Sequence, residues 1–292
     1  AVCAVLSVCS VVAVSCPAVV EEVLPVVQPK TESGKKEAAK GEAVPAEIPP
    51  AAHPQPEPGK KEASKEKAVP AEMPKTMVTE EELKSCIDKA YDSKFDTEEI
   101  APLVKVDDTY YMELFHGATI ALKDMALSIL PHLMTTSAKK NDVKNEIVIL
   151  TATSGDTGKA ALAGFADVEG TKIIVFYPKN GVSRVQELQM VTQKGDNTSV
   201  VAIHGNFDNA QSGVKAMFEN KELEKELNEA GYQFSSANSI NIGRLVPQVV
   251  YYVYAYAKLL QNEEIAEDEE INVVVPTGNF GNILAAYYAK NM

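Results

Sequence analysis

A single lysine stands inside an apolar stretch of the chain, FHGATIALKDM at residues 115–125. The residues around Lys123 include Ile120, Leu122 and Met125, and a strongly hydrated ammonium group among such neighbours is costly unless its head reaches water. One interpretation therefore places Lys123 at the solvated edge of a half-buried helix. The other gives the amine a chemical role, because burial lowers the pKa of a lysine and leaves a nucleophilic amine.

Two glycine-rich loops could bind anions. SGDTG at 154–158 and TGNFGN at 277–282 each join an apolar run to a helical pattern. Glycines let the backbone approach a ligand, and the amides at a helix start point toward negative charge. Each loop alone could also be an ordinary turn with an N-cap, and neither matches the Walker A loop or the Rossmann fingerprint. Together with the lysine, they predict a cofactor that carries a phosphate and an aldehyde, such as pyridoxal phosphate.

The elements around these loops alternate between two periodicities. Apolar runs predict strands at 146–153, 171–178, 198–205 and 271–277, and helical patterns separate them, including a long helix over 240–261. This alternation predicts an α/β protein with parallel sheets, in which ligands bind beyond the carboxyl ends of the strands. A capping box at Thr79 and Glu82 predicts the first helix, with Cys86 on its apolar side.

The first 76 residues differ from the rest in composition. They contain the repeat GKKEAAKGEAVPAEIP at 34–49 and GKKEASKEKAVPAEMP at 59–74, and this mixture predicts a disordered, low-complexity tail over residues 1–76. The first 20 residues are apolar, with the length of a signal peptide or a marginal membrane span, but they lack a basic segment. The alternative is an extension without a role in the fold. The catalytic region is therefore expected over 77–292.

Charge and cysteine content limit the partners and the compartment. The net charge of −13 argues against nucleic acid and against an anionic membrane as partners of the folded part. Only Cys86 of the four cysteines lies beyond the tail, and no cysteine or histidine spacing predicts a metal site. The folded part is thus expected to be cytoplasmic and free of disulfides.

Several stretches resemble one enzyme family. FHGATIALKD resembles the pattern F-H-G-P-T-x-A-F-K-D around the Schiff-base lysine of threonine synthases, which are pyridoxal phosphate enzymes of fold type II. Further motifs of that family follow in the same order, over about residues 79 to 292: ATSGDTGKAALAGF, YPKNGVSRVQELQM, GNFDNAQ, SANSINIGRLVPQ and PTGNFGNILAAYYAK.

The resemblance implies a role for each matching residue. Lys123 would bind pyridoxal phosphate as a Schiff base and act as the catalytic group. The cofactor would also contact Asp156, and its phosphate would be held by Gly278, Asn279, Phe280, Gly281 and Asn282. The substrate would be bound by Ser154, Gly155, Thr157, Asn238, Ser239 and Arg244. A surface ion pair is the alternative for Arg244, and His116 is expected to shape the lysine loop or to be merely structural.

The family also implies a reaction and a domain arrangement. The reaction would convert O-phosphohomoserine and water to threonine and phosphate; the alternatives are a phospho-lyase that releases a 2-keto acid and an inactive fragment. Residues 146–237 would form a smaller βα subdomain inserted in the large domain. Ala118 and Leu122 replace the family's proline and phenylalanine, with modest effects expected. The chain stops one helix after GNFGN, so we expect a C-terminally truncated chain with an incomplete large domain, and a foreign tail at its start.

Overall fold

The computed structural model describes residues 77–239, 241–276 and 278–292. The predicted tail, its repeat and its apolar start lie outside these residues. The helices are α2 (Glu80–Ala90), α3 (Asp124–Lys140), α4 (Asp156–Phe165), α5 (Arg184–Val191), α6 (Phe207–Glu219), α7 (Lys221–Glu229), α8 (Ile242–Gln261) and α9 (Gly281–Lys290). The strands are β1 (Leu103–Val106), β2 (Thr109–Met112), β3 (Glu146–Ala152), β4 (Thr171–Pro178), β5 (Thr198–Ile203) and β6 (Tyr232–Ser236).

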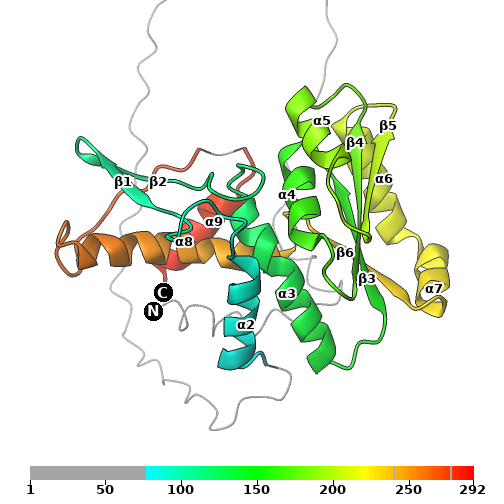
Figure 1. The fold of residues 1–292 in the computed structure, drawn as a ribbon, viewed down its shortest axis with the longest axis horizontal. Coiled ribbons are helices and arrows are strands. Elements are labelled where there is room, and N and C mark those ends of the chain that lie inside the picture. The colour runs from blue at the N-terminus through cyan, green and yellow to red at the C-terminus, as the bar shows by residue number, and fades with distance from the viewer. Residues whose placement is uncertain (1–76, 240, 277) are drawn as a thin grey trace, which may run out of the picture. The chain divides into compact units, whose positions relative to one another are not determined.

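The central element is a four-stranded parallel sheet in the order β5-β4-β3-β6 (Figure 1). In the register, Ile149 of β3 stands opposite Ile173 of β4 on one side and Ser235 of β6 on the other. The parallel α/β architecture expected from the alternating patterns is therefore confirmed. Strands β1 and β2 form a separate antiparallel hairpin.

Both faces of the sheet are covered by helices. Ile147 and Ile149 of β3 pack with buried residues of α3, α4 and α5. Val148 and Leu150, which point to the other face because side chains alternate along a strand, pack with α6. Because both faces of β3 are buried, its sequence is a continuous apolar run and does not alternate between apolar and polar residues. The carboxyl ends of the strands remain open to loops.

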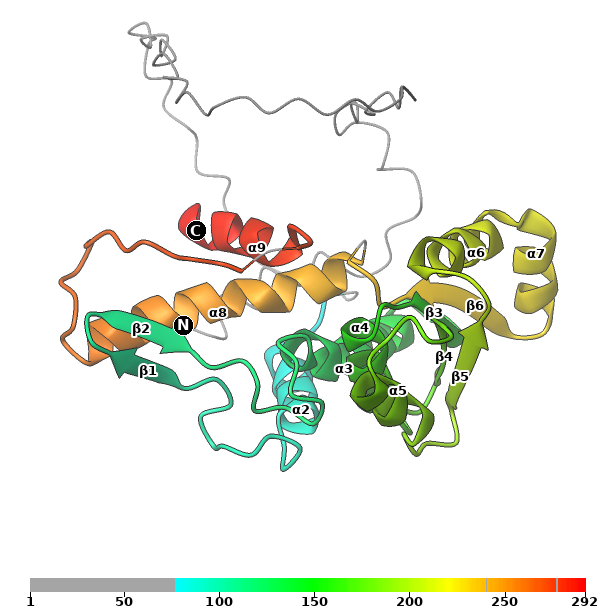
Figure 2. The same cartoon turned by 90° about the horizontal axis from the view of Figure 1, so that it is seen from above.

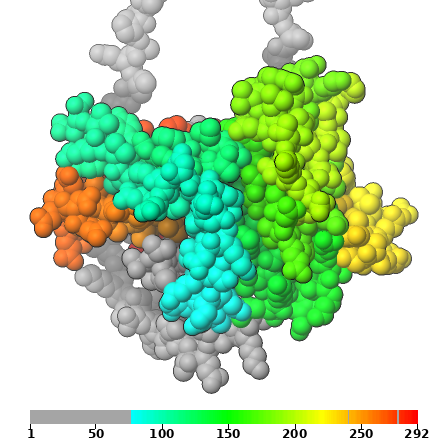
Figure 3. Space-filling model, in the orientation of Figure 1, coloured from blue at the N-terminus to red at the C-terminus, as the bar shows by residue number. Residues whose placement is uncertain are grey.

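The other helices pack around α3. Helix α3 contacts α2, α4 and α8, and α9 packs on α8 (Figure 2). Helix α2, which is visible at the surface in Figure 3, begins at the predicted capping box and buries Cys86 and Ala90 against Ile129 of α3. Cys86 thus behaves as the small apolar residue that its position predicts. No helix in the described ranges is long and apolar enough to cross a membrane.

One predicted strand is wrong. Residues 271–276 have no strand assignment, and Val274 is 90% exposed. A strand exists only where a neighbour accepts and donates its backbone hydrogen bonds, and no other strand pairs with this run within the described part of the chain. Residue 277, the last of the predicted strand, lies outside the described residues. The long helix begins at Ile242, after its N-cap Asn241.

The contact between α3 and α4 depends on a residue without a side chain. A Cβ atom on Gly164 of α4 would collide with the backbone carbonyl of Leu127 in α3, which cannot move without displacing the helix. A Cβ on Gly213 of α6 would meet nothing within 4 Å. The two glycines therefore form a matched pair of helical positions: Gly164 has no space for a side chain, whereas Gly213 has space for one.

We expect Gly164→Ala to lower the free energy of unfolding by about 2 kcal/mol, because overpacking forces the two helices apart. Gly213→Ala should instead raise it by up to about 1 kcal/mol, since alanine is the better helix former. Urea unfolding followed by circular dichroism measures both. Equal effects of the two substitutions would contradict the close contact at Gly164.

Candidate active site

The loop before α3 is organised by one buried carboxylate. Asp124 accepts hydrogen bonds from the backbone N–H of Thr119 at 2.8 Å, from the Thr119 hydroxyl, and from the N–H of Ala121 at 3.3 Å. A Cβ on Gly117 would lie 2.5 Å from the Asp124 Cβ, so only glycine fits there. The carboxylate thus closes the loop upon itself and fixes the backbone from which Lys123 projects.

His116 ties the start of this loop to two acidic residues. Its Nδ1 lies 2.5 Å from an Asp96 oxygen, and its Nε2 lies 2.8 Å from a Glu113 oxygen. The backbone N–H of Asp96 also donates to the His116 carbonyl at 3.0 Å. The hydrogen bond to Glu113, followed by that to Asp96, raises the pKa of His116 above its ordinary value. The imidazolium is therefore favoured at this position.

Lys123 precedes the first residue of α3 and is mostly buried, with 22% of its side chain exposed. Burial is the main cause that lowers its pKa; Asp156 opposes this shift, whereas Arg244 and Lys159 add to it. Such an environment favours a neutral amine over a hydrated ammonium ion. The side chain therefore does not lie at a solvated helix edge, and it has the chemistry that covalent binding of an aldehyde needs.

The loop after β3 has a backbone that requires glycine. Gly155, the N-cap residue of α4, has a φ of 132°, and a Cβ there would collide with the Gln186 amide. The Thr153 hydroxyl accepts the N–H groups of Gly155 at 2.9 Å and Gly158 at 2.8 Å. Ser154 is exposed and Thr157 is half-buried. The loop is therefore rigid, and Ser154 is its most accessible polar side chain.

Asp156 is the residue of this loop that faces Lys123. One of its oxygens lies 4.0 Å from the Lys123 Nζ, and the other lies 3.2 Å from the Lys159 Nζ and accepts from the Gln186 amide at 2.9 Å. Burial acts to raise the pKa of Asp156, but the hydrogen bonds from Gln186 and Lys159 outweigh it, so the pKa lies below its ordinary value. The carboxylate is thus ionised between two amines.

Beyond β6, two predicted substrate residues hold the backbone. The Asn238 amide donates to the carbonyl of Ala152, at the end of β3, at 3.1 Å. Arg244 is 6% exposed, and its Nη1 donates to the Ala237 carbonyl at 3.1 Å. The alternative of a surface ion pair for Arg244 is wrong, because the side chain is buried and pairs with no carboxylate among the described residues. Ser239 is exposed.

The second glycine-rich loop leads into α9. Asn282 donates to the Gln248 side chain at 3.0 Å and accepts from the Tyr252 hydroxyl, so α8 anchors the loop. A Cβ on Gly278 would meet nothing within 4 Å, and no side chain caps the helix at Phe280, which is 75% exposed. Asn279 is exposed and Gly281 is the first residue of α9. Open space before an uncapped helix start suits an anion.

The structure thus joins the predicted residues into two groups. Lys123 and Asp156 lie together, and the charge of Arg244 acts on Lys123. The second glycine-rich loop is linked to Arg244 through Gln248, whose amide donates to the Arg244 carbonyl at 2.8 Å. No hydrogen bond or ion pair joins Gly278, Asn279 or Phe280 to Lys123 in the described residues.

Sequence reasoning missed three residues that shape the site. Lys159 follows Asp156 by three residues in a helix, a spacing that brings opposite charges together. Gln186 belongs to a capping box with Ser183, a pattern that was available in the sequence. Asp124, next to the lysine, carried no signal of its loop-closing role.

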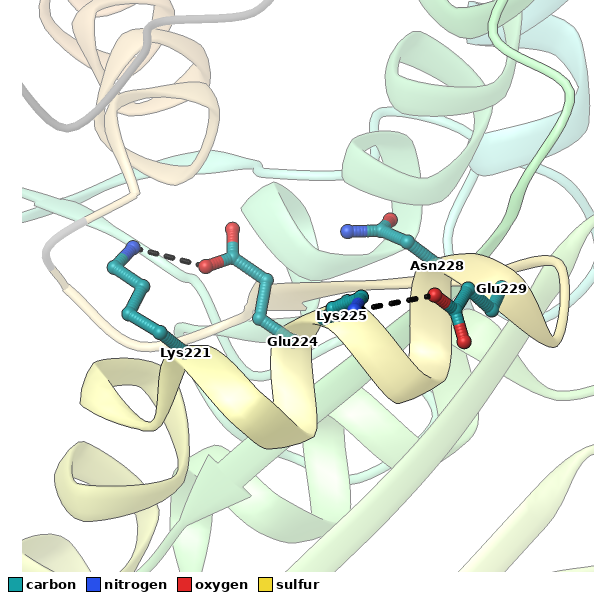
Figure 4. A pocket seen from close by; sticks show the side chains of 5 residues that line it. All are labelled: Lys221, Glu224, Lys225, Asn228 and Glu229. Carbon is teal, nitrogen blue, oxygen red and sulfur yellow. Dashed lines mark hydrogen bonds and ion pairs between the residues drawn. The ribbon is translucent and has the colours of Figure 1, made fainter.

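Two surface hollows lie at different distances along the chain from the predicted site residues, and only one of them borders the lysine loop. One of about 420 Å³ lies along α7 and is lined by Lys221, Glu224, Lys225, Asn228 and Glu229, with ion pairs Lys221–Glu224 and Lys225–Glu229 (Figure 4). Helix α7 carries none of the predicted site residues. Another hollow of about 390 Å³ is lined by Ala118 and Thr119 of the lysine loop together with Ala163 of α4, Gln189 of α5 and residues 192–194, which follow α5. The second hollow therefore borders the lysine loop.

Known proteins resemble the chain in sequence and in structure. A human protein named threonine synthase-like 1 is 40% identical over 217 residues, covering 72% of this chain and 29% of that protein. Threonine synthase of Saccharomyces cerevisiae is 34% identical over 226 residues, covering 74% of this chain and 42% of the yeast protein. The chain therefore spans less than half of the length of these relatives. A scan against protein-family models finds no match.

The structural comparison agrees. The crystal structure of threonine synthase from Brucella melitensis with bound pyridoxal phosphate matches with a TM-score of 0.65 and 37% identity, covering 74% of this chain and 44% of that one. Threonine synthase from yeast matches with a TM-score of 0.62 and 35% identity, covering 72% and 41%. The fold and these structural matches define the class of the protein, the pyridoxal phosphate enzymes of fold type II. Within this class, the chain belongs to the threonine synthase family.

The His116 cluster predicts a pH dependence of stability. A pKa that is higher in the folded state gives a stabilising contribution that is complete below the ordinary histidine pKa and is lost as pH rises through the folded value. We expect the wild-type chain to lose stability relative to His116→Gln as pH rises above about 6.5, the ordinary histidine pKa. Urea unfolding of both proteins across this range measures the difference. A difference that is constant with pH would show that no imidazolium forms between Asp96 and Glu113.

Proposed function

We propose that the chain carries the catalytic lysine of a pyridoxal phosphate-dependent lyase that converts O-phosphohomoserine and water to threonine and phosphate. The single observation that carries the proposal is Lys123: a mostly buried amine with a lowered pKa, beside an ionised Asp156, at the carboxyl edge of a parallel sheet. The family membership supports the same assignment.

The residues present fit pyridoxal phosphate. Lys123 supplies the amine for the aldehyde, and the rigid Gly155 loop faces the same lysine through Asp156. The open backbone at Gly278 and the uncapped start of α9 suit a phosphate dianion. When bound, the cofactor supplies an electron sink for the bonds at the substrate Cα. The protein must supply binding, orientation and proton transfer.

Different residues provide the proton transfer and the substrate binding. In our proposal the Lys123 Nζ takes the proton from the substrate Cα and moves protons at Cβ, because burial lowers its pKa and so favours the neutral amine that a base requires. Ser154, Gly155 and Thr157 bind the substrate carboxylate through the start of α4. Asn238, Ser239 and Arg244 bind the substrate phosphate, and the guanidinium supplies the full positive charge in an acidic protein.

A phospho-lyase that releases a 2-keto acid is the second candidate. The relatives named threonine synthase-like 1 reach 40% identity, whereas those named threonine synthase reach 34% to 38%. Incubation of the chain with pyridoxal phosphate and O-phosphohomoserine, followed by proton NMR, tests both candidates. Threonine supports the synthase, and a 2-keto acid without threonine supports the lyase. If neither product forms, the result supports the third alternative, an inactive fragment. The cytoplasmic location stays a prediction.

The first variant tests the covalent bond to the cofactor. Pyridoxal phosphate attached to Lys123 should give the chain a near-visible absorbance that survives dialysis. Lys123→Ala should lose it completely, because Lys159, the other amine beside Asp156, is held in an ion pair with that carboxylate at 3.2 Å. Lys172→Ala, which removes an exposed lysine in an ion pair with Glu146, should retain it. Absorbance that persists in Lys123→Ala would refute the assignment.

The second variant tests the substrate phosphate. Arg244→Ala should weaken the binding of O-phosphohomoserine by on the order of 2 kcal/mol, about thirtyfold in Kd, because a charge-assisted hydrogen bond is lost. Isothermal titration calorimetry measures the binding, while the cofactor absorbance should stay intact. Arg244→Lys should recover only part, since an ammonium cannot form the two-pronged contact.

Arg184, the other arginine of the chain, provides the matched control. It is exposed on α5 and pairs with Glu187 at 2.7 Å, so Arg184→Ala should leave the binding unchanged. If Arg244→Ala bleached the cofactor and left substrate affinity unchanged, the two phosphates would have been assigned to the wrong sites.

A further inference from the structure

A second lysine, Lys159, shares the carboxylate that faces the proposed catalytic amine. Its Nζ lies 3.2 Å from Asp156 Oδ1, whereas Lys123 Nζ lies 4.0 Å from Oδ2. Gln186 donates to the same Oδ1 at 2.9 Å. The carboxylate therefore makes its short contacts with Lys159 and Gln186, and only a long one with Lys123.

Lys159 cannot easily leave this arrangement. Only 10% of its side chain is exposed, compared with 47% for Asp156. A buried ammonium without a partner is strongly unfavourable, so Lys159 must keep its carboxylate. An exposed ion pair could open and close at little cost, but this pair is anchored by its buried member. The Asp156 carboxylate is thus held in its short contact with Lys159, one turn further along α4, and stays 4.0 Å from the Lys123 Nζ.

The charges that face Lys123 come from three helices. Asp156 and Lys159 lie on α4, Arg244 lies on α8, and Asp124 lies next to it in α3. Asp124 is engaged by the lysine loop through Thr119 and Ala121. Asp156 is therefore the carboxylate whose position decides how strongly Lys123 is held as an ammonium ion.

We propose that Lys159 is a positioning residue, which keeps the Asp156 carboxylate at a distance of 4.0 Å from the Lys123 Nζ rather than in a close ion pair, and so limits how strongly the ammonium form of Lys123 is stabilised. The inference rests on the proposed function, because it gives Lys123 a reason to be neutral. It assigns to Lys159 a role beyond an ion pair within a helix. Without Lys159, Asp156 would turn to Lys123 and stabilise its charged form.

The test measures the protonation of Lys123 directly in the full chain without cofactor. Trace labelling with 1-fluoro-2,4-dinitrobenzene, which reacts only with unprotonated amines, followed by peptide mass spectrometry, gives the pH at which Lys123 becomes half-reactive. Lys159→Gln should raise this pH by about one unit or more, since a neighbouring opposite charge shifts a pKa by that amount. Lys159→Arg should restore most of the wild-type profile, because it keeps the positive charge.

A matched control comes from α7. Lys225 pairs with Glu229 at 3.7 Å on a helix surface with 77% of its side chain exposed, so Lys225→Gln should leave the labelling of Lys123 unchanged. Circular dichroism confirms that each variant is folded. If Lys159→Gln does not fold, Asp156→Asn offers the converse test: removing the carboxylate should lower the pH at which Lys123 becomes half-reactive.

A double variant separates the effect of Lys159 that acts through Asp156 from the direct repulsion between the Lys159 and Lys123 charges. The shift caused by Lys159→Gln should be smaller in the Asp156→Asn background, because only direct repulsion between the two amines then remains. A shift of equal size in both backgrounds would overturn the positioning role, and so would a loss of stability with no shift at all. The outcome is independent of the cofactor: a chain that fails to bind pyridoxal phosphate refutes the proposed function while leaving this result readable.

Discussion

A parallel sheet has to be covered on both faces, and this requirement determines where everything else in the molecule can lie. The central strand β3 buries alternate side chains against α3, α4 and α5 on one face and against α6 on the other. Since all four strands run in the same direction, their carboxyl ends meet along one edge. The polar loops that follow β3 and β6 are therefore neighbours, and the amide of Asn238 reaches the carbonyl of Ala152 across them.

Helix α3, which begins directly after Lys123, is one of the helices that cover the sheet. Helix α3 packs on α4 and on α8, so the residue just before it, Lys123, faces the start of α4 and the side of α8 that carries Arg244. The lysine loop is held together by Asp124, which accepts hydrogen bonds from the backbone amides of Thr119 and Ala121. Positioning and chemistry are thus divided between adjacent residues: Asp124 fixes the backbone, and Lys123 is left free to react.

Much of the fold could be predicted because its signals are local. The apolar runs of β3, β4 and β5, the capping box of α2 and the long apolar helix α8 each follow from spacing within a short window. The run at 271–276 shows the limit, because an apolar sequence indicates a strand but cannot supply the neighbouring strand that makes one. Lys123 and Asp156 stood out by type and context. Lys159 and Gln186 carried only local helix signals, the i,i+3 charge spacing and the capping box, and their convergence on one carboxylate depends on the packing of α5 against α4.

Gly164 carries no functional group, yet it acts as a spacer for the site. Its missing side chain lets the carbonyl of Leu127 touch α4, and Leu127 lies one turn after Lys123. The distance between the axes of α3 and α4 is therefore set at this contact, and with it the separation of the amine on one helix from the carboxylate on the other. Gly164, an uncharged residue without a side chain, therefore helps to set the distance between the Lys123 amine and the Asp156 carboxylate.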